Sequence, residues 1–487
     1  MARILGPTLT GIYSLVLFIY YIGEILTNLG IKNLTVKYIS QFSADEDKGN
    51  LQRVFAYAIK VKCILTIICS LSLIFASGYL AEFYSEQKLK WYIILVSIIL
   101  IPEGIALIFQ SAIQGLQEYK ALAARALFTA PIHVILTIAV LKLQYGILGL
   151  VSVNLFMAFL DLVIYYLFVK RKIKFRLRFK TPFPKDFKKR LFKYNWQVAV
   201  IAIVDAIVWQ KSEVFFLGKM STQAEVAFYT LSYNLSSWTI GFLPNILYAV
   251  LFPRISEFYG MNDRNSIERI YLTSTRYLMI LCVPILFIGI GLSKNLVSVI
   301  YGSSYMPMTL PLNILFIATC YTAVCGPTSL VIYAMERQDI ILKVAIFTTF
   351  INIALDFMLI PKLGAIGAAI ANSVAQIVSV TVCTVKLCRF LVAKFPINDL
   401  LRIIGCSTIA LIVIYFITKM DNALLGLAAG AISGTILYLV CIVFAGVLRA
   451  SDFDALYSIK TKIPFIMQKS FEKLVVFVQN HAVQDKI

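Results

Sequence analysis

Eleven ionisable side chains lie inside stretches of the chain that are otherwise apolar. A charge at the centre of a bilayer is costly unless it is paired or hydrated, so such residues usually line a water-filled cavity or an ion pathway. The eleven residues are Glu24, Lys60, Lys62, Glu103, Arg125, His133, Asp161, Asp205, Lys211, Glu213 and Asp356. They predict at least one hydrated site within the apolar part of the molecule.

The depth of each charge within its stretch divides this group. The four deepest residues are Glu24, Glu103, His133 and Asp205. We expect these four to line or gate a solvated cavity, although hydrogen bonds between packed helices are an alternative explanation. Lys60 and Lys62 lie about two helical turns, roughly 10 Å, from one end of their stretch, where a lysine can extend toward the headgroups.

The apolar stretches themselves predict transmembrane helices, because about 20 apolar residues are needed to cross the hydrocarbon core. Thirteen windows of this length occur, at residues 11–31, 54–78, 91–113, 122–141, 146–169, 195–217, 225–251, 273–300, 308–334, 340–360, 364–388, 399–418 and 423–448. Hydrophobic residues make up 60% of the chain, charged residues only 14%, and the mean hydropathy is +0.83. These values predict an all-α integral membrane protein.

A long internal repeat relates the two halves of the chain. Tyr13-Ser14-Leu15 recurs in the second half as Tyr229-Thr230-Leu231, and Ile39-Ser40-Gln41-Phe42 recurs at the same offset as Ile255-Ser256-Glu257-Phe258. A second block, Tyr145-Gly146, recurs at nearly the same offset as Leu363-Gly364. Six helices separate the copies, so both enter the membrane in the same direction. A repeated bundle of membrane helices is typical of a transporter.

Polar residues within the repeat fall on shared helix faces. Asp205, Trp209 and Ser212 lie on one face because they are spaced by four and seven positions. The offset of the repeat also aligns His133 closely with Asn352, and Asp356 lies one turn beyond Asn352. Two interpretations stay open: a wet cleft shared by both halves, and ordinary helix packing.

Basic residues set the expected orientation, since Lys and Arg are retained in cytoplasmic loops. One set of alternate helix ends carries 34 basic residues and the other carries 8. The first set, which includes the basic segment 170–193, is expected to be cytoplasmic. The formal net charge of +20 follows from this topology, so no nucleic-acid partner is expected. The basic linker and the tail 449–487, which we expect to be amphipathic, would contact anionic membrane lipids.

Several classes of chemistry lack the necessary residues. The nine cysteines lie in or beside apolar windows without a zinc-binding spacing, and the chain has only two histidines, His133 and His481. No Gly-rich phosphate loop ending in Gly-Lys-Ser/Thr is present. Asp452-Phe453-Asp454 has a spacing that some metal-dependent glycosyltransferases use, but capping of a helix start is the simpler interpretation. From the sequence we therefore expect that the protein binds no metal ion or cofactor and is not an enzyme.

Two segments resemble a known family. Ala2-Arg3-Ile4-Leu5-Gly6-Pro7 with Gly11-Ile12-Tyr13-Ser14-Leu15, and Leu363-Gly364-Ala365-Ile366-Gly367-Ala368-Ala369, are similar to the polysaccharide and O-antigen flippases of the multidrug/oligosaccharidyl-lipid/polysaccharide exporter superfamily. Gln210-Lys211-Ser212-Glu213 before Leu217-Gly218 resembles another stretch of that family. The resemblance extends from the first residue to about position 450.

This resemblance implies a fourteen-helix, two-lobe bundle like that of multidrug and toxic compound extrusion (MATE) transporters. In the family a helix precedes Arg-Ile-Leu-Gly-Pro, whereas here these residues follow Met1, so thirteen helices are visible and the first family helix is expected to be missing. The expected parts are an N-terminal lobe (1–169), a cytoplasmic linker (170–193), a C-terminal lobe (194–390), two extra helices (391–448) and a cytoplasmic tail (449–487).

The resemblance also implies a flippase that moves polyprenyl-pyrophosphate-linked oligosaccharide across the cytoplasmic membrane by alternating access, as a monomer. Residues expected to contact the headgroup or line its cavity are Lys60, Lys62, Arg125, Lys211 and Trp209. Residues expected to couple H⁺ or Na⁺ or to gate the cavity are Glu24, Asp205, Glu213, Glu103 and His133.

Three alternatives remain open on the sequence, one of which is a structural scaffold without transport activity. An ion-coupled multidrug exporter of the same superfamily would share the repeat, but we expect it to have an acidic, aromatic cleft with few lysines. A membrane glycosyltransferase or polymerase would usually need a large outer loop, and the longest one expected here, 294–308, is short.

Overall fold

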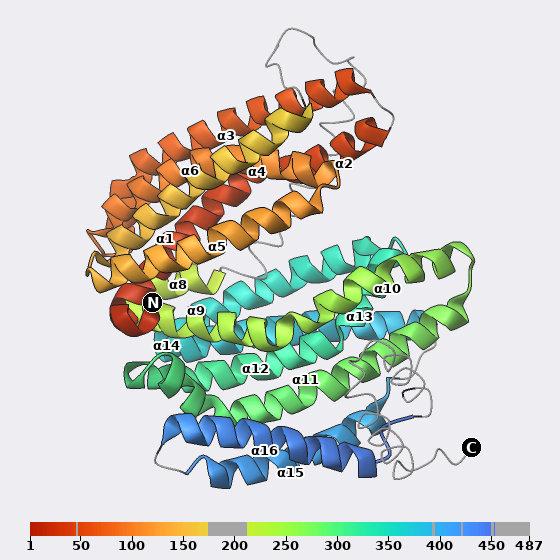
Figure 1. Cartoon of the computed structure of the whole chain (residues 1–487). Coiled ribbons are helices and arrows are strands. Elements are labelled where there is room, and N and C mark those ends of the chain that lie inside the picture. Colours follow the sequence, from red (N-terminus) through yellow and green to blue (C-terminus); the bar gives the residue numbers. More distant parts are fainter. Residues whose placement is uncertain (45–46, 174–211, 392–394, 420–421, 450–451, 453–487) are drawn as a thin grey trace, which may run out of the picture. The chain divides into compact units, whose positions relative to one another are not determined.

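The computed structural model describes residues 1–44, 47–173, 212–391, 395–419, 422–449 and 452, and its regular elements are all helices (Figure 1). The labelled elements up to α9 are α1 (Ala2–Asn28), α2 (Ile31–Ala44), α3 (Lys48–Phe83), α4 (Leu89–Gly115), α5 (Tyr119–Lys142), α6 (Gly146–Ile173), α8 (Ser212–Met220) and α9 (Gln223–Ser236). A π-helical turn (Ser237–Gly241) and a 3₁₀ turn (Ser303–Met308) interrupt the later part. The remaining helices are α10 (Leu243–Gly260), α11 (Arg264–Ile300), α12 (Thr309–Val324), α13 (Gly326–Ala334), α14 (Gln338–Leu391), α15 (Ile397–Ile417) and α16 (Ala423–Phe444).

Eleven helical segments within the described residues are long and apolar enough to cross a membrane. They account for twelve of the thirteen predicted windows, because α14 contains both the 340–360 and the 364–388 windows. The remaining window, 195–217, lies mostly outside the described residues, and its last residues open α8. The prediction of an all-α, multi-span membrane protein is confirmed.

The internal repeat is visible in how its helices begin. Asp47 caps the N-terminus of α3 by accepting a hydrogen bond from the backbone N–H of Asn50, at 3.0 Å. Asp263, its counterpart in the second half, caps α11 in the same way with the N–H of Ser266, at 3.1 Å. Hydrogen bonds from Asn50 and Ser266 lower the pKa of the two carboxyls below the usual aspartate value. Both capping carboxylates therefore stay negatively charged near neutral pH, and this charge interacts favourably with the positive N-terminal end of each helix dipole.

The repeat also preserves backbone conformations that are rare for ordinary residues. Gly146 and Gly364 both have a positive φ, +58° and +52°, and each separates two consecutive helical segments. Gln117 and Glu336, which correspond in the repeat, adopt the left-handed conformation at +59° and +57°. Such conformations disfavour most side chains, so their recurrence supports the predicted repeat independently of side-chain identity.

The reversal inside α14 requires glycine for a second reason. Glu225 accepts a hydrogen bond from the backbone N–H of Ala365 at 2.7 Å, so its carboxylate caps the helical segment that restarts after Gly364. A Cβ atom on Gly364 would lie 2.7 Å from the nearer Glu225 oxygen. Pro361 removes one backbone donor just before this point, which further favours a break.

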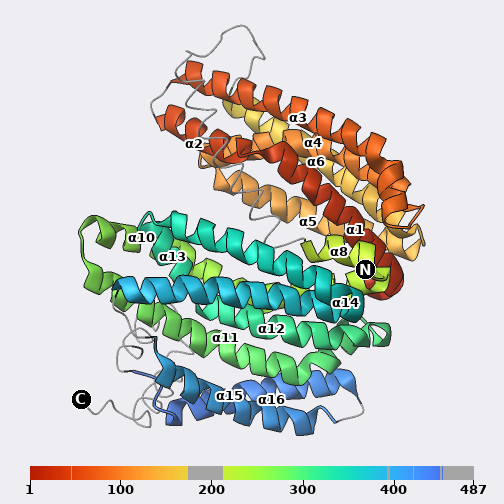
Figure 2. The same ribbon diagram turned by 180° about the vertical axis from the view of Figure 1, so that it is seen from behind.

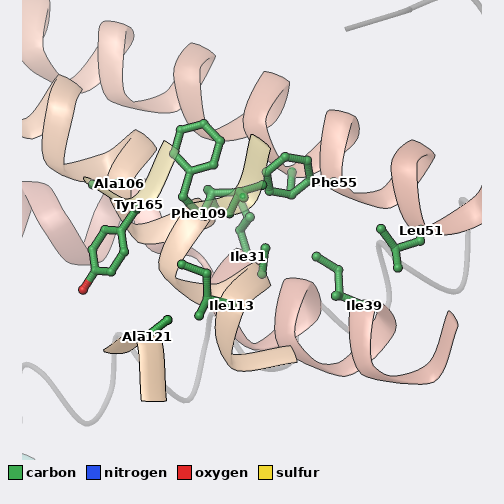
Figure 3. Packing of buried hydrophobic residues seen from close by; sticks show 13 residues of the cluster. Ile31, Ile39, Leu51, Phe55, Ala106, Phe109, Ile113, Ala121 and Tyr165 are labelled. Atoms are coloured by element: carbon green, nitrogen blue, oxygen red, sulfur yellow. The ribbon is translucent and has the colours of Figure 1, made fainter. Parts of the chain in front are cut away.

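Two compact units make up the described structure, residues 1–230 with 352–368 and residues 231–351 with 369–487. In the first unit α4 packs against α3 and α6, and a cluster of apolar side chains fills the space beside α2 (Figure 3). The rings of Phe55 and Phe109 lie 5.6 Å apart near Ile31 in this cluster. Tyr165 lies at the edge of this cluster, and its hydroxyl points away from the apolar side chains.

In the second unit α11 packs against α12, α15 and α16, and the last two helices lie side by side (Figure 2). Glycines at Gly430 and Gly434 allow α16 to approach its neighbours, because Leu292 and Ile414 occupy the space of a side chain there. Small residues are the usual means of close helix packing where lipid provides no hydrophobic driving force.

A buried ion pair between Arg276 and Asp452 connects α11 to the segment after α16. Arg276 on α11 is 2% exposed and donates to the Asp452 carboxylate at 2.5 Å and to the carbonyl of Val447 at 2.9 Å. The hydroxyl of Tyr277 and the backbone N–H of Arg449 also donate to this carboxylate, each at 2.8 Å. Asp452 therefore acts as an anchor between α11 and the segment after α16.

The hydrogen bonds determine the charge state of this anchor. Burial by itself would raise the pKa of Asp452, but the donors from Arg276, Arg449 and Tyr277 outweigh it and leave the pKa below the usual aspartate value. The stabilising effect is therefore complete above the ordinary carboxyl pKa and is lost as the pH falls through the depressed value.

We predict that Asp452→Asn destabilises the protein by about 3–5 kcal/mol at neutral pH, because Arg276 stays buried without its counter-charge. Asp339→Asn is the matched control, since Asp339 forms exposed ion pairs worth at most about 1 kcal/mol. Thermal unfolding in detergent, followed by tryptophan fluorescence, measures both. The loss should persist from neutral pH down to about pH 4 and shrink below it. Equal melting temperatures for the two variants would contradict the anchor.

Candidate functional site

The first unit encloses a polar cavity between α1, α3, α4, α5 and α6. Its volume is about 90 Å³, and its polar lining comes from Glu24, Lys62, Glu103, Arg125 and Asp161, together with tyrosines and a threonine. A second cavity of about 200 Å³ shares Glu103 and Asp161 with the first. Both volumes exceed what a single water molecule needs, so the charges have room for hydration or for ligand groups.

Lys62 is the most enclosed charge in this cavity. Its side chain is 1% exposed, and its ammonium group donates to the hydroxyl of Thr27 at 3.0 Å. Gly104 on the facing helix makes room for it, because a Cβ atom there would lie 2.9 Å from the Lys62 Cε and 2.5 Å from a Thr66 methyl. The sequence predicts that Lys62 extends toward the membrane surface, whereas in the structure its side chain is buried inside the helix bundle.

Arg125 also lines the cavity, but it already has a partner. Its Nε donates to Asp161 at 2.7 Å, a second nitrogen pairs with the other carboxylate oxygen, and the guanidinium lies 5.4 Å from the centre of the Tyr165 ring. Asp161 is one of the eleven charges within apolar stretches of the sequence, but its spacing predicts no role for it. The two residues lie on different helices, so the periodicity of either helix could not have revealed the pair.

Glu24 and Glu103 bring two more carboxylates to the same cavity. Glu24 is half-buried on α1, and Glu103 is accessible on α4. Together with Asp161 they face two cations, Lys62 and Arg125. The cavity therefore provides acceptors for hydroxyl groups and one cation, Lys62, that forms no salt bridge among the described residues.

The remaining predicted residues lie elsewhere. Lys60 is exposed on α3 and is not among the residues that line this cavity. His133 is exposed on α5 and contacts the wall of the second cavity through Asn154, whose amide oxygen lies 3.2 Å from Nε2. Asp205, Trp209 and Lys211 lie outside the described residues.

A second polar cluster joins the start of α8 to the middle of α14. Glu213 and Asp356 are both 0% exposed, and Asn352 is 1% exposed. The Asn352 amide donates to Glu213 and to the hydroxyl of Ser212, both at 3.0 Å. Neither oxygen of Asp356 makes a hydrogen bond of ordinary geometry within the part of the chain that the structure describes.

The two buried carboxylates of this cluster lie close enough to interact electrostatically. Two negative charges cannot both remain buried side by side without a proton or a bound cation. The sequence predicts that Asn352 and Asp356 share one helix face and that Glu213 is a coupling residue. The contact between Asn352 and Glu213 was not predicted, because it depends on how α8 packs against α14.

The chain is similar to known proteins of one family. A family model described as polysaccharide biosynthesis protein matches residues 1–310. The chain is 22% identical over 274 residues to a Haloferax volcanii protein named probable low-salt glycan biosynthesis flippase Agl15, a match covering 55% of this chain and 57% of the relative. The chain thus spans little more than half the length of that relative.

Two solved structures share the fold. An inward-closed structure of the lipid II flippase MurJ is 19% identical, with a TM-score of 0.63 over 90% of this chain and 96% of that one. An inward-facing multidrug resistance MATE family transporter is 16% identical, with a TM-score of 0.69 over 80% of this chain and 92% of that one. The predicted MATE-like architecture is confirmed. Since the family model covers well over half of the chain, the protein belongs to the polysaccharide biosynthesis protein family.

Proposed function

We propose that the protein is a flippase that moves a polyprenyl-pyrophosphate-linked oligosaccharide across the cytoplasmic membrane by alternating access, for the synthesis of a polysaccharide or surface glycan. Family membership, the glycan flippase relative and the fold of the lipid II flippase support this proposal. The observation that carries it is the polar cavity of the first unit, in which Lys62 is buried inside an otherwise apolar helix bundle.

The chemistry of this cavity suits the polar end of such a substrate. Sugar hydroxyls and a pyrophosphate lose their hydration in an apolar layer, and that loss is costly unless protein groups replace the water. Glu24 and Glu103 accept hydrogen bonds from hydroxyls, and Lys62 provides a positive charge for phosphate. Arg125 would become available to phosphate only when its pair with Asp161 opens.

The cavity lies toward the helix ends that carry the basic loops. Glu24 and Thr27 lie in the last two turns of α1, and Arg125 lies in the second turn of α5. The excess of Lys and Arg in the adjoining loops predicts that these ends face the cytoplasm. A substrate assembled on the cytoplasmic side would therefore meet the cavity first.

The buried cluster of Glu213, Asn352 and Asp356 is our proposed coupling site. Asp356 lies about two turns before the Gly364 reversal, toward the opposite, poorly basic helix ends. A proton or Na⁺ bound there would neutralise two carboxylates that otherwise repel each other. Because binding changes the stability of one conformation relative to another, an ion gradient can favour one direction of the transport cycle.

One observation favours a second candidate, export of cationic compounds. The first-unit cavity has three carboxylates and two cations, an excess of negative charge that suits a positively charged ligand. The shared fold with a multidrug transporter is compatible with this function without showing it. Uptake of a fluorescent cation into vesicles containing the purified protein tests it, and the absence of uptake would exclude it.

We predict that Lys62→Gln slows flipping at least about tenfold, since removing one buried, hydrogen-bonded charge costs about 2–5 kcal/mol. The measurement is the inside-to-outside transfer of a labelled polyprenyl-pyrophosphate oligosaccharide in liposomes. Lys60→Gln is the matched control, because Lys60 is an exposed lysine close by on the same helix. Its rate should stay within about twofold of the wild type. Equal rates for Lys62→Gln and Lys60→Gln would remove the cavity from the transport path.

We predict that Asp356→Asn and Glu213→Gln abolish the acceleration of flipping by a Na⁺ or pH gradient. Coupling between sites typically amounts to about 1–3 kcal/mol, so the lost acceleration should be roughly 5- to 150-fold. The same liposomes measure it, with each gradient imposed in turn. Glu257→Gln is the control, since Glu257 is exposed and pairs with a neighbouring arginine at the surface. A full gradient response in Asp356→Asn would exclude this cluster as the coupling site.

A further inference from the structure

The second unit contains a larger cavity that the proposed transport does not use. It lies between α12 and the last turns of α14 and has a volume of about 560 Å³. Tyr321 and Cys325 line it from one side, and Thr381, Val385 and Cys388 line it from the other. This volume lies within the range of small-molecule binding sites, about 300–1,000 Å³.

The polar atoms in the wall of this cavity largely satisfy one another. The hydroxyls of Tyr321 and Thr381 lie 2.8 Å apart, and the hydroxyl of Thr384 lies 3.0 Å from that of Thr328. Thr381 also donates to the carbonyl of Ile377 at 2.6 Å. What remains for a ligand is mainly the aromatic ring, methyl groups and sulfur atoms, a surface that favours hydrocarbon.

Basic residues lie on the α14 side of the cavity. Arg389 lines the cavity, and Lys386 lies one turn earlier on the same helix. Both side chains are exposed, and neither forms an ion pair within the described residues. A guanidinium that has no counter-charge in the described part of the chain and lines an apolar cavity is well suited to a phosphate group, which it can bind through two parallel hydrogen bonds.

We propose that this cavity binds an anionic amphiphile, with its hydrocarbon chain between α12 and α14 and its phosphate at Arg389. Two sources share this chemistry: an anionic phospholipid of the bilayer, and the polyprenyl phosphate part of a lipid-linked glycan. The site is distinct from the charged cavity of the first unit, and a phospholipid would occupy it whether or not the protein transports a glycan. The position at the basic, predicted cytoplasmic end of α14 fits a ligand from the inner leaflet.

Native mass spectrometry of the full-length protein in detergent tests the proposal. The probes are phosphatidylglycerol against phosphatidylcholine, and a polyprenyl phosphate against the uncharged polyprenol. We expect at least one anionic probe to be retained about tenfold more than its neutral counterpart, because only the anionic probe can accept charge-assisted hydrogen bonds from Arg389. Arg389→Gln should remove this preference, and Val385→Trp, which fills the cavity, should weaken retention of both members of the pair.

The matched control is Lys343→Gln, an exposed lysine on the first half of the same helix, which should bind like the wild type. Preference for phosphatidylglycerol assigns the site to bilayer lipid, and preference for polyprenyl phosphate assigns it to the glycan carrier. The proposal is overturned if Arg389→Gln binds like the wild type. It is also overturned if Val385→Trp folds normally and retains the anionic probes fully, because surface charge alone would then explain their retention.

A second measurement needs no substitution in the cavity. Cys388 is half-buried in the cavity wall, where its sulfur lies 3.7 Å from the Tyr271 hydroxyl. An amphiphile seated in the cavity should slow alkylation of Cys388 by a maleimide at least about threefold, as measured by peptide mass spectrometry. Cys441 on α16, which is also half-buried but is not among the lining residues, serves as the internal control. Unchanged alkylation of Cys388 at saturating phosphatidylglycerol and polyprenyl phosphate would also overturn the proposal.

Discussion

The high cost of an unsatisfied polar group in hydrocarbon governs this structure. Backbone groups satisfy one another inside long helices, and the charged side chains that remain must find partners, water or a ligand. The charge of Arg276 is balanced inside the protein, because its two terminal nitrogens donate to the carboxylate of Asp452 and to the carbonyl of Val447. Asp356 differs, since neither of its buried oxygens makes a hydrogen bond of ordinary geometry among the described residues and no cation pairs with it there. Structural and functional charges can be separated on this basis.

The charged residues of the first-unit cavity also differ in how fully other protein groups satisfy them. Arg125 is largely committed to Asp161 and stacks near Tyr165, so its main effect is to shape the cavity wall. Within the described chain, Lys62 donates a hydrogen bond to a threonine hydroxyl and depends on the carboxylates of Glu24 and Glu103 around the same cavity. Its position is made possible by the missing side chain of Gly104. A glycine in the middle of an apolar helix thus creates space for a charge.

Sequence patterns predicted those features that depend on local physics. Helix spans follow from apolar length, and the repeat follows from motifs whose structural counterparts include the caps at Asp47 and Asp263 and the turns at Gly146 and Gly364. Contacts between helices could not be predicted in this way. The pairs Lys62–Thr27 and Asn352–Glu213 join residues far apart in the sequence, and their formation depends on helix rotation and packing distance. Asp205, Trp209 and Lys211 remain predictions because they lie outside the described residues.

The matching helix caps and turns of the two halves have an evolutionary consequence. Asp47 and Asp263 fix corresponding helices at the same starting point, whereas among the described residues the first half buries the cation Lys62 and the second half buries the carboxylates Glu213 and Asp356. Duplication therefore preserved the scaffold and freed its interior to specialise. Under the proposed function, a small driving ion and a bulky cargo would occupy separate sites, so selection could change the affinity for one without altering the binding of the other.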